Sequence, residues 1–146
     1  MATRWVYRPT PIEQDEICRR YVSPLPTTQR AYVEAPPPHT TGAAVDVTLC
    51  DRSGMPLDLG ADFDEFGDMA WLTFFETDRP DTTTSEDLLR RNRRRVLYWA
   101  MIAAGFAAYK WEYWHYELGT RRAAATARQN EAQYSGVAPW PKEWAR

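Results

Sequence analysis

The clearest periodic pattern of apolar and polar positions runs over residues 85–104. Ser85 is a favourable N-cap residue, acidic residues follow it, and Gly105 supplies a left-handed stop after the last apolar position. Apolar residues recur between them at three- and four-residue spacing. The stripe contains Leu89, Val96, Ala100 and Ala104, flanked by Leu88, Leu97 and Met101. The pattern predicts a long helix with one apolar stripe.

A second helix is predicted near the start of the chain. Thr10-Pro11-Ile12-Glu13 combines an N-cap residue, a proline at the first helical position and a glutamate three residues after the cap. The helix is expected to end near Val22, before the proline-rich residues 23–26. From there the chain is predicted to be a loop that ends in Pro36-Pro37-Pro38. Because such a run is stiff and extended, it delivers His39 to a defined place.

Two stretches carry strand patterns. Residues 44–49 show an alternating pattern that includes β-branched side chains, which predicts a strand. The residues that follow, Asp51-Arg52-Ser53-Gly54, favour a turn and predict a hairpin-like connection. Residues 112–118 are dense in aromatic side chains and predict a buried strand. Between these strands, residues 58–76 are expected to form a long loop packed by its own aromatics. The Ala- and Arg-rich residues 120–133 predict a polar helix, followed by an irregular tail.

Composition narrows the class of protein. A length of 146 residues favours one compact domain, and 44% hydrophobic with 26% charged residues is ordinary for a globular chain. The formal net charge of -2 gives no broad basic surface for nucleic acid. We expect no membrane-crossing helix and no secretory signal, and hence a cytoplasmic protein. The arginine-rich residues 90–95 keep local nucleic-acid binding open as a minor hypothesis.

The candidate chemistry centres on histidine, because the chain has only two, His39 and His115. Asp46 follows the first by seven residues, and Glu112 precedes the second in a Glu-x-x-His pattern. A catalytic zinc ion takes three ligands from histidine and carboxylate, keeps one position open for water, and needs a nearby carboxylate as general base. These four residues supply that set.

One geometric condition applies to the Glu-x-x-His pattern. In a regular strand, residues three apart point to opposite faces, so Glu112 and His115 converge only if Glu112 lies in a bend before the strand or a bulge intervenes. A helix would place both on one face directly. The aromatic composition favours the strand, with Glu112 at its entrance.

These segments resemble a known family. HTTGAAVDVTL, GMPLDLGADFDEFGD and WEYWHYEL resemble the D-alanyl-D-alanine dipeptidase family, zinc metallopeptidases related in fold to the D-Ala-D-Ala carboxypeptidases. The family pattern is Ser-x-His-x-x-Gly-x-Ala-x-Asp. It is matched here by His39, Gly42, Ala44 and Asp46, whereas Pro37 stands in place of the serine.

The resemblance implies a role for each site residue. It makes Glu112 the general base, with one zinc ion per chain held by His39, Asp46 and His115. Tyr7-Arg8-Pro9 resembles the family's Gly-Tyr-Arg-Pro, whose arginine holds the scissile carbonyl oxygen, so Arg8 inherits that role. Phe63-Asp64 resembles the step whose carboxylate holds the substrate's amino terminus, which assigns that role to Asp64.

The expected fold is α+β, a small antiparallel sheet that carries the zinc site and is flanked by helices. Residues 1–118 would form the peptidase-like domain, shortened at its N-terminus, because family members carry about half a domain before the Tyr-Arg-Pro step. Residues 119–146 would form a polar helix and an irregular tail.

The resulting hypothesis is zinc-dependent hydrolysis of a small D-amino-acid dipeptide such as D-Ala-D-Ala. Two alternatives stay open: a catalytically degenerate zinc-binding protein of the same fold, and a peptidase that acts on other cell-wall peptides. A small peptide is the expected partner. Self-association into a homo-oligomer, which would cover a face left open by the short N-terminus, also stays open.

Overall fold

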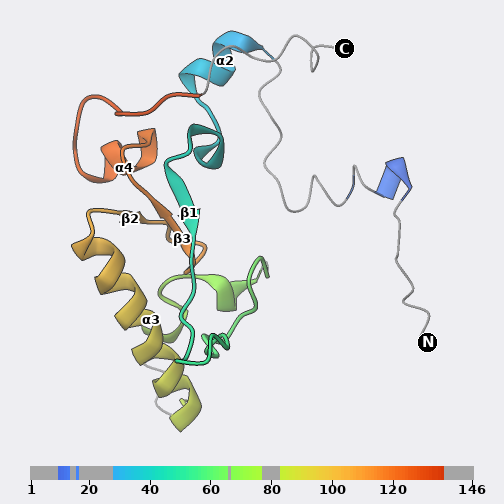
Figure 1. Cartoon of the computed structure of the whole chain (residues 1–146), viewed down its shortest axis with the longest axis vertical. Coiled ribbons are helices and arrows are strands. Elements are labelled where there is room, and N and C mark those ends of the chain that lie inside the picture. The colour runs from blue at the N-terminus through green and yellow to red at the C-terminus, as the bar shows by residue number, and fades with distance from the viewer. Residues whose placement is uncertain (1–9, 14–15, 17–27, 66, 77–82, 137–146) are drawn as a thin grey trace.

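A three-stranded antiparallel sheet lies at the centre of the computed structural model, which describes residues 10–13, 16, 28–65, 67–76 and 83–136 (Figure 1). The strand order is β1-β3-β2, so β3 is central. The strands are β1 (Ala44–Asp46), β2 (Ala107–Ala108) and β3 (His115–Glu117). The helices are α2 (Gln29–Glu34), α3 (Ser85–Ala103) and α4 (Arg121–Thr126), with 3-10 helices at Pro38–Thr41, Asp68–Ala70 and Phe74–Glu76. The predicted α+β class is confirmed.

Helix α3 begins and ends nearly where the sequence predicts. Its N-cap is Thr84 rather than Ser85, because Thr84 and Asp87 form a reciprocal capping box in which each side chain accepts a backbone N–H from the other residue. After the last turn, Gly105 takes the predicted left-handed conformation with φ 89°.

The apolar stripe of α3 is exposed, although Leu97 beside it is buried. Leu89 and Val96 are 48% and 61% exposed, whereas Arg94 is 3% exposed. The Arg94 guanidinium donates hydrogen bonds to the carbonyl oxygens of Leu59, Met69 and Trp71, at 2.7, 2.5 and 2.7 Å respectively. These carbonyls belong to an irregular loop that has no strand partner, so their pairing requires a side-chain donor. The need to pair these carbonyls, rather than the apolar pattern, therefore decides which side of α3 is buried.

Neighbouring arginines on α3 also form ion pairs with acidic residues of this chain. Arg90 donates to Asp58 at 2.9 Å, and Arg95 forms an ion pair with Glu76. The arginine-rich residues 90–95 therefore hold α3 against residues 58–76, which lie alongside it (Figure 1). The apolar part of this contact is the core, which contains Leu59, Ala61, Ala70, Leu97, Tyr113, Trp114 and Tyr116.

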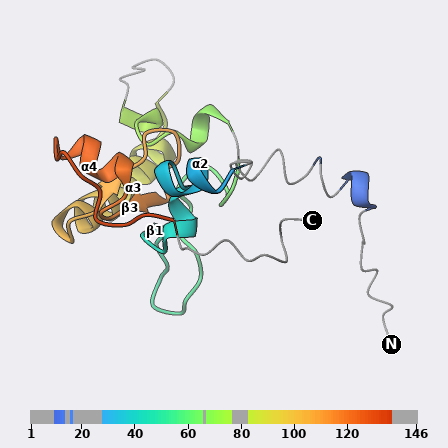
Figure 2. The same ribbon diagram turned by 90° about the horizontal axis from the view of Figure 1, so that it is seen from above.

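Both predicted strands exist but are short. Pairing beside β1 extends to Val47, whose N–H donates to the Trp114 carbonyl at 2.9 Å. The hairpin-like connection is confirmed, because Cys50 and Pro56 form an isolated antiparallel bridge around a turn (Figure 2). Strand β2 was not predicted, since two alanines carry neither alternation nor β-branched side chains.

The helices nearer the two ends differ from expectation. Thr10 and Glu13 form the predicted capping hydrogen bonds, but most of that helix lies outside the described residues. The predicted loop before His39 contains α2. Of the three prolines, Pro37 has an extended backbone with φ -56° and ψ 137°, and Pro38 already begins the 3-10 helix that carries His39. Helix α4 is shorter than predicted, because the chain turns left-handed at Arg128, where φ is 56°.

Helix α4 packs beside β2 with Ala123 and Ala124 buried. The proposed boundary between residues 118 and 119 remains a prediction. Among the described helices, none combines the length and hydropathy that crossing a bilayer requires.

Candidate metal centre

The pairing register of β1 and β3 places Asp46 directly opposite His115. Backbone hydrogen bonds join Val47 to Trp114 and Leu118 to Ala43, and antiparallel pairs alternate between bonded and non-bonded positions. Asp46 and His115 therefore occupy a non-bonded position, where facing side chains approach most closely. The Asp46 Oδ1 atom lies 2.9 Å from His115 Nδ1.

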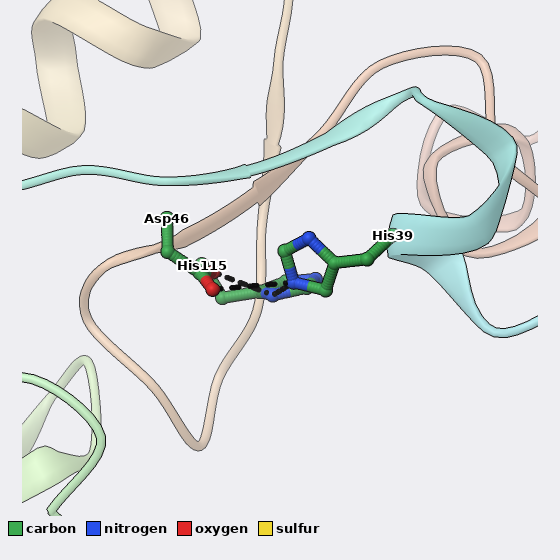
Figure 3. A group of neighbouring side chains, drawn as sticks. All are labelled: His39, Asp46 and His115. Atoms are coloured by element: carbon green, nitrogen blue, oxygen red, sulfur yellow. Dashed lines mark hydrogen bonds and ion pairs between the residues drawn. The ribbon is translucent and has the colours of Figure 1, made fainter. Parts of the chain in front are cut away.

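His39 comes from the 3-10 helix Pro38–Thr41, one turn before β1. Gly42 ends that helix in the left-handed conformation with φ 70°, and its N–H donates to the His39 carbonyl. This turn directs the chain into β1, which explains why a glycine suits the position. His39 Nε2 reaches 3.2 Å from Asp46 Oδ2 and 3.1 Å from His115 Nδ1 (Figure 3).

The donor set fits a zinc ion. One ligand atom from each of His39, Asp46 and His115 lies within 4.8 Å of the others. Three donors at roughly 2.0–2.1 Å from one ion, at tetrahedral angles, are about 3.3 Å apart. The closest separations are near that value: 2.9 Å from His115 Nδ1 to Asp46 Oδ1, 3.2 Å from His39 Nε2 to the other oxygen of Asp46, and 3.1 Å between the two histidine nitrogens. The His39 side chain is half exposed, so the group opens to solvent on one side.

Glu112 stands next to this group, in the bend that precedes β3. In that bend the backbone N–H of His115 donates to the backbone carbonyl of Glu112. The side-chain Oε2 atom of Glu112 lies 3.8 Å from His115 Nδ1. The sequence-based placement at the strand entrance is confirmed, and the helical alternative is wrong. Burial raises the pKa of the Glu112 carboxyl; His115 opposes this, and Asp46 and Asp64 add to it.

The other two predicted site residues are less closely tied to the group. Asp64 is exposed and left-handed with φ 61°, a conformation that aspartate tolerates better than most residues. The negative charge of Asp64 contributes to raising the pKa of Glu112. The preceding Phe63 packs against the ring of Trp114, with centroids 5.7 Å apart. Arg8 lies outside the described residues.

Glu117 is a site residue that the sequence analysis missed. It is 1% exposed, and its Oε1 atom lies at hydrogen-bond distance, 2.9 Å, from His115 Nε2. Burial opposes ionisation, but hydrogen bonds from His115 and Thr120 and the charge of Arg122 hold the pKa of Glu117 below its usual value. The available signal was His-x-Glu inside a predicted strand, since alternate residues share a face.

Comparison with known proteins identifies the family of this chain. The D-Ala-D-Ala dipeptidase family matches residues 2–135. A D-alanyl-D-alanine dipeptidase from Synechocystis is 34% identical over 105 residues, which cover 70% of this chain and 42% of the relative. One from Escherichia coli is 35% identical over 80 residues, which cover 55% and 37%. The chain thus matches less than half the length of each relative. With the match spanning nearly all of its residues, the chain belongs to the D-Ala-D-Ala dipeptidase family of peptidases.

Proposed function

We propose that this protein hydrolyses a small D-amino-acid dipeptide such as D-Ala-D-Ala, with one zinc ion held by His39, Asp46 and His115. The convergence of these three side chains beside Glu112 is the observation that carries the proposal. A bound zinc ion supplies Lewis acidity, polarising the peptide carbonyl and lowering the pKa of a water molecule toward neutrality. The two relatives named D-alanyl-D-alanine dipeptidase support the choice of substrate.

Each remaining residue acts on a different part of the substrate. Glu112 accepts the proton of the attacking water and passes it to the leaving amine, for which a half-buried carboxylate near the ligands is well placed. Asp64 pairs with the substrate's ammonium group. Arg8 neutralises the negative charge that develops on the carbonyl oxygen. The cytoplasmic location and any self-association remain predictions from the sequence.

The test compares the wild-type chain with Glu112→Gln. Zinc content is measured by elemental analysis, and release of free D-alanine from D-Ala-D-Ala is followed. We expect about one zinc ion per chain in both proteins, with turnover reduced roughly 10²–10⁴-fold in the variant. Asp68→Asn, which removes an exposed carboxylate elsewhere, is the matched control and should leave turnover unchanged.

Two outcomes would contradict the proposal. Zinc-loaded protein that cleaves no D,D- or L,D-dipeptide, with the variant equally inactive, would favour the zinc-binding protein without catalysis. Cleavage of longer cell-wall peptides but not of dipeptides would favour the other alternative.

A further inference from the structure

The ring of His115 is held from both sides by protein groups. Its Nδ1 atom faces Asp46 and His39, whereas its Nε2 atom lies 2.9 Å from Glu117 Oε1. An imidazole that binds a metal ion through one nitrogen carries its proton on the other. An acceptor fixed at Nε2 therefore decides which nitrogen of His115 is free for the metal.

Glu117 is built to be that acceptor. In the sheet its direct neighbours are Ala44 on β1 and Ala107 on β2, and both are small enough to leave room for a buried side chain. Thr120 donates its hydroxyl to Glu117 Oε2, and an Arg122 guanidinium nitrogen lies 3.1 Å from Oε1. A buried carboxylate is costly unless it is paired in this way.

We propose that Glu117 is the positioning residue of the metal centre: by accepting the Nε2 proton of His115, it fixes the ring and presents Nδ1 to the metal ion. The inference rests on the proposed metal site. Carboxylates that orient a ligating histidine raise its basicity, and their loss weakens metal affinity by about 10–100-fold.

A purely structural role for Glu117 predicts something different. Thr120 is also the N-cap of α4, where its Oγ1 accepts the Ala123 N–H at 3.1 Å, so Glu117 could serve only to dock that helix. In that case its removal would lower stability without changing metal affinity in the folded protein. Thr120→Val separates the two roles, because it removes a hydrogen bond to the same carboxylate while leaving the one to His115.

The experiment measures zinc affinity by competition with a chromophoric chelator, using folded full-length protein. Relative to the wild type, we expect affinity to fall about 10–100-fold in Glu117→Ala. The fall should be smaller in Glu117→Gln, whose amide oxygen still accepts from Nε2, and negligible in Thr120→Val, which should only unfold at a lower temperature. Equal affinity in all four proteins would overturn the inference while leaving the proposed site intact.

A spectroscopic readout needs no variant. Because the chain has two histidines, ¹⁵N-histidine labelling of the zinc-loaded wild type gives only two ring systems to assign. We expect a slowly exchanging proton on Nε2 of His115 and none on Nδ1. A proton on Nδ1 would overturn the inference even if Glu117→Ala did not fold. Failure of the wild type to bind zinc would refute the proposed site and the inference together.

Discussion

Asp46 and His115 are direct partners across an antiparallel pair, with Asp46 Oδ1 2.9 Å from His115 Nδ1. Sixty-eight residues separate them in the chain, so only the pairing of β1 with β3 brings them together. Since a one-residue slip would turn either side chain to the opposite face, the same register that builds the sheet also builds the site.

Asp46→Asn tests whether this pair holds a metal ion. The amide keeps the shape of the side chain but loses the charge that attracts a cation. Loss of a group that only orients a ligand weakens metal affinity by about 10–100-fold, so we expect loss of a ligand charge to lower zinc affinity by about 100-fold or more. Chelator competition measures the change. Asp68→Asn makes the same substitution at an exposed site and should bind zinc like the wild type. Unchanged affinity in Asp46→Asn would remove Asp46 from the ligand set.

Arg94→Lys tests the unexpected core arginine. Lysine cannot reproduce the planar fork that serves three carbonyl oxygens, so buried acceptors would lose their donors. We expect a loss of about 1–3 kcal/mol in the free energy of unfolding, measured with urea. Arg95→Lys at a half-exposed ion pair should stay within roughly 0.5 kcal/mol of the wild type. Equal effects at both positions would mean that the carbonyl contacts contribute little.

The Asp58–Arg90 pair gives a prediction for pH. The hydrogen bond from Arg90 holds the pKa of Asp58 below its usual value, even though burial opposes ionisation. A carboxyl with a lowered folded-state pKa stabilises the protein above its unfolded pKa of about 4, and this stabilisation is lost as the pH falls through the folded value. Asp58→Asn should therefore be less stable than the wild type at pH 7, and the difference should shrink toward pH 3. A difference that does not change with pH would contradict the assignment.

Gly60→Ala tests a close contact in the loop that Arg94 holds. Gly60 has φ 100°, and an added Cβ atom would lie 2.4 Å from a ring atom of Phe75. We expect a loss of more than about 1 kcal/mol in the free energy of unfolding. Gly54→Ala is the matched control, because it has a similar φ of 86° but no atom within 4 Å. The difference between the two variants isolates the clash from backbone strain.

The sequence by itself determined the elements whose signals are local. The N-cap signal at Ser85 lay one residue from the true cap of α3, the glycine stop marked its end, and turn residues indicated the hairpin-like connection after β1. The scarcity of histidine pointed to His39 and His115. The strand period required either a bend before the strand or a bulge at Glu112, and Glu112 lies in a bend. Such features depend on residues only a few positions apart, so one sequence is enough to find them.

Only the tertiary structure decided which groups need partners from distant segments. Arg94 is buried on α3 while the apolar stripe is exposed, because its guanidinium donates to three loop carbonyls. Strand β2 exists because its two alanines pair with β3, and Glu117 fits beside His115 because Ala44 and Ala107 leave space on either side. Buried polar groups need hydrogen-bond partners and buried side chains need space, and both are supplied by segments far apart in the chain. A local pattern of residues therefore does not reveal them.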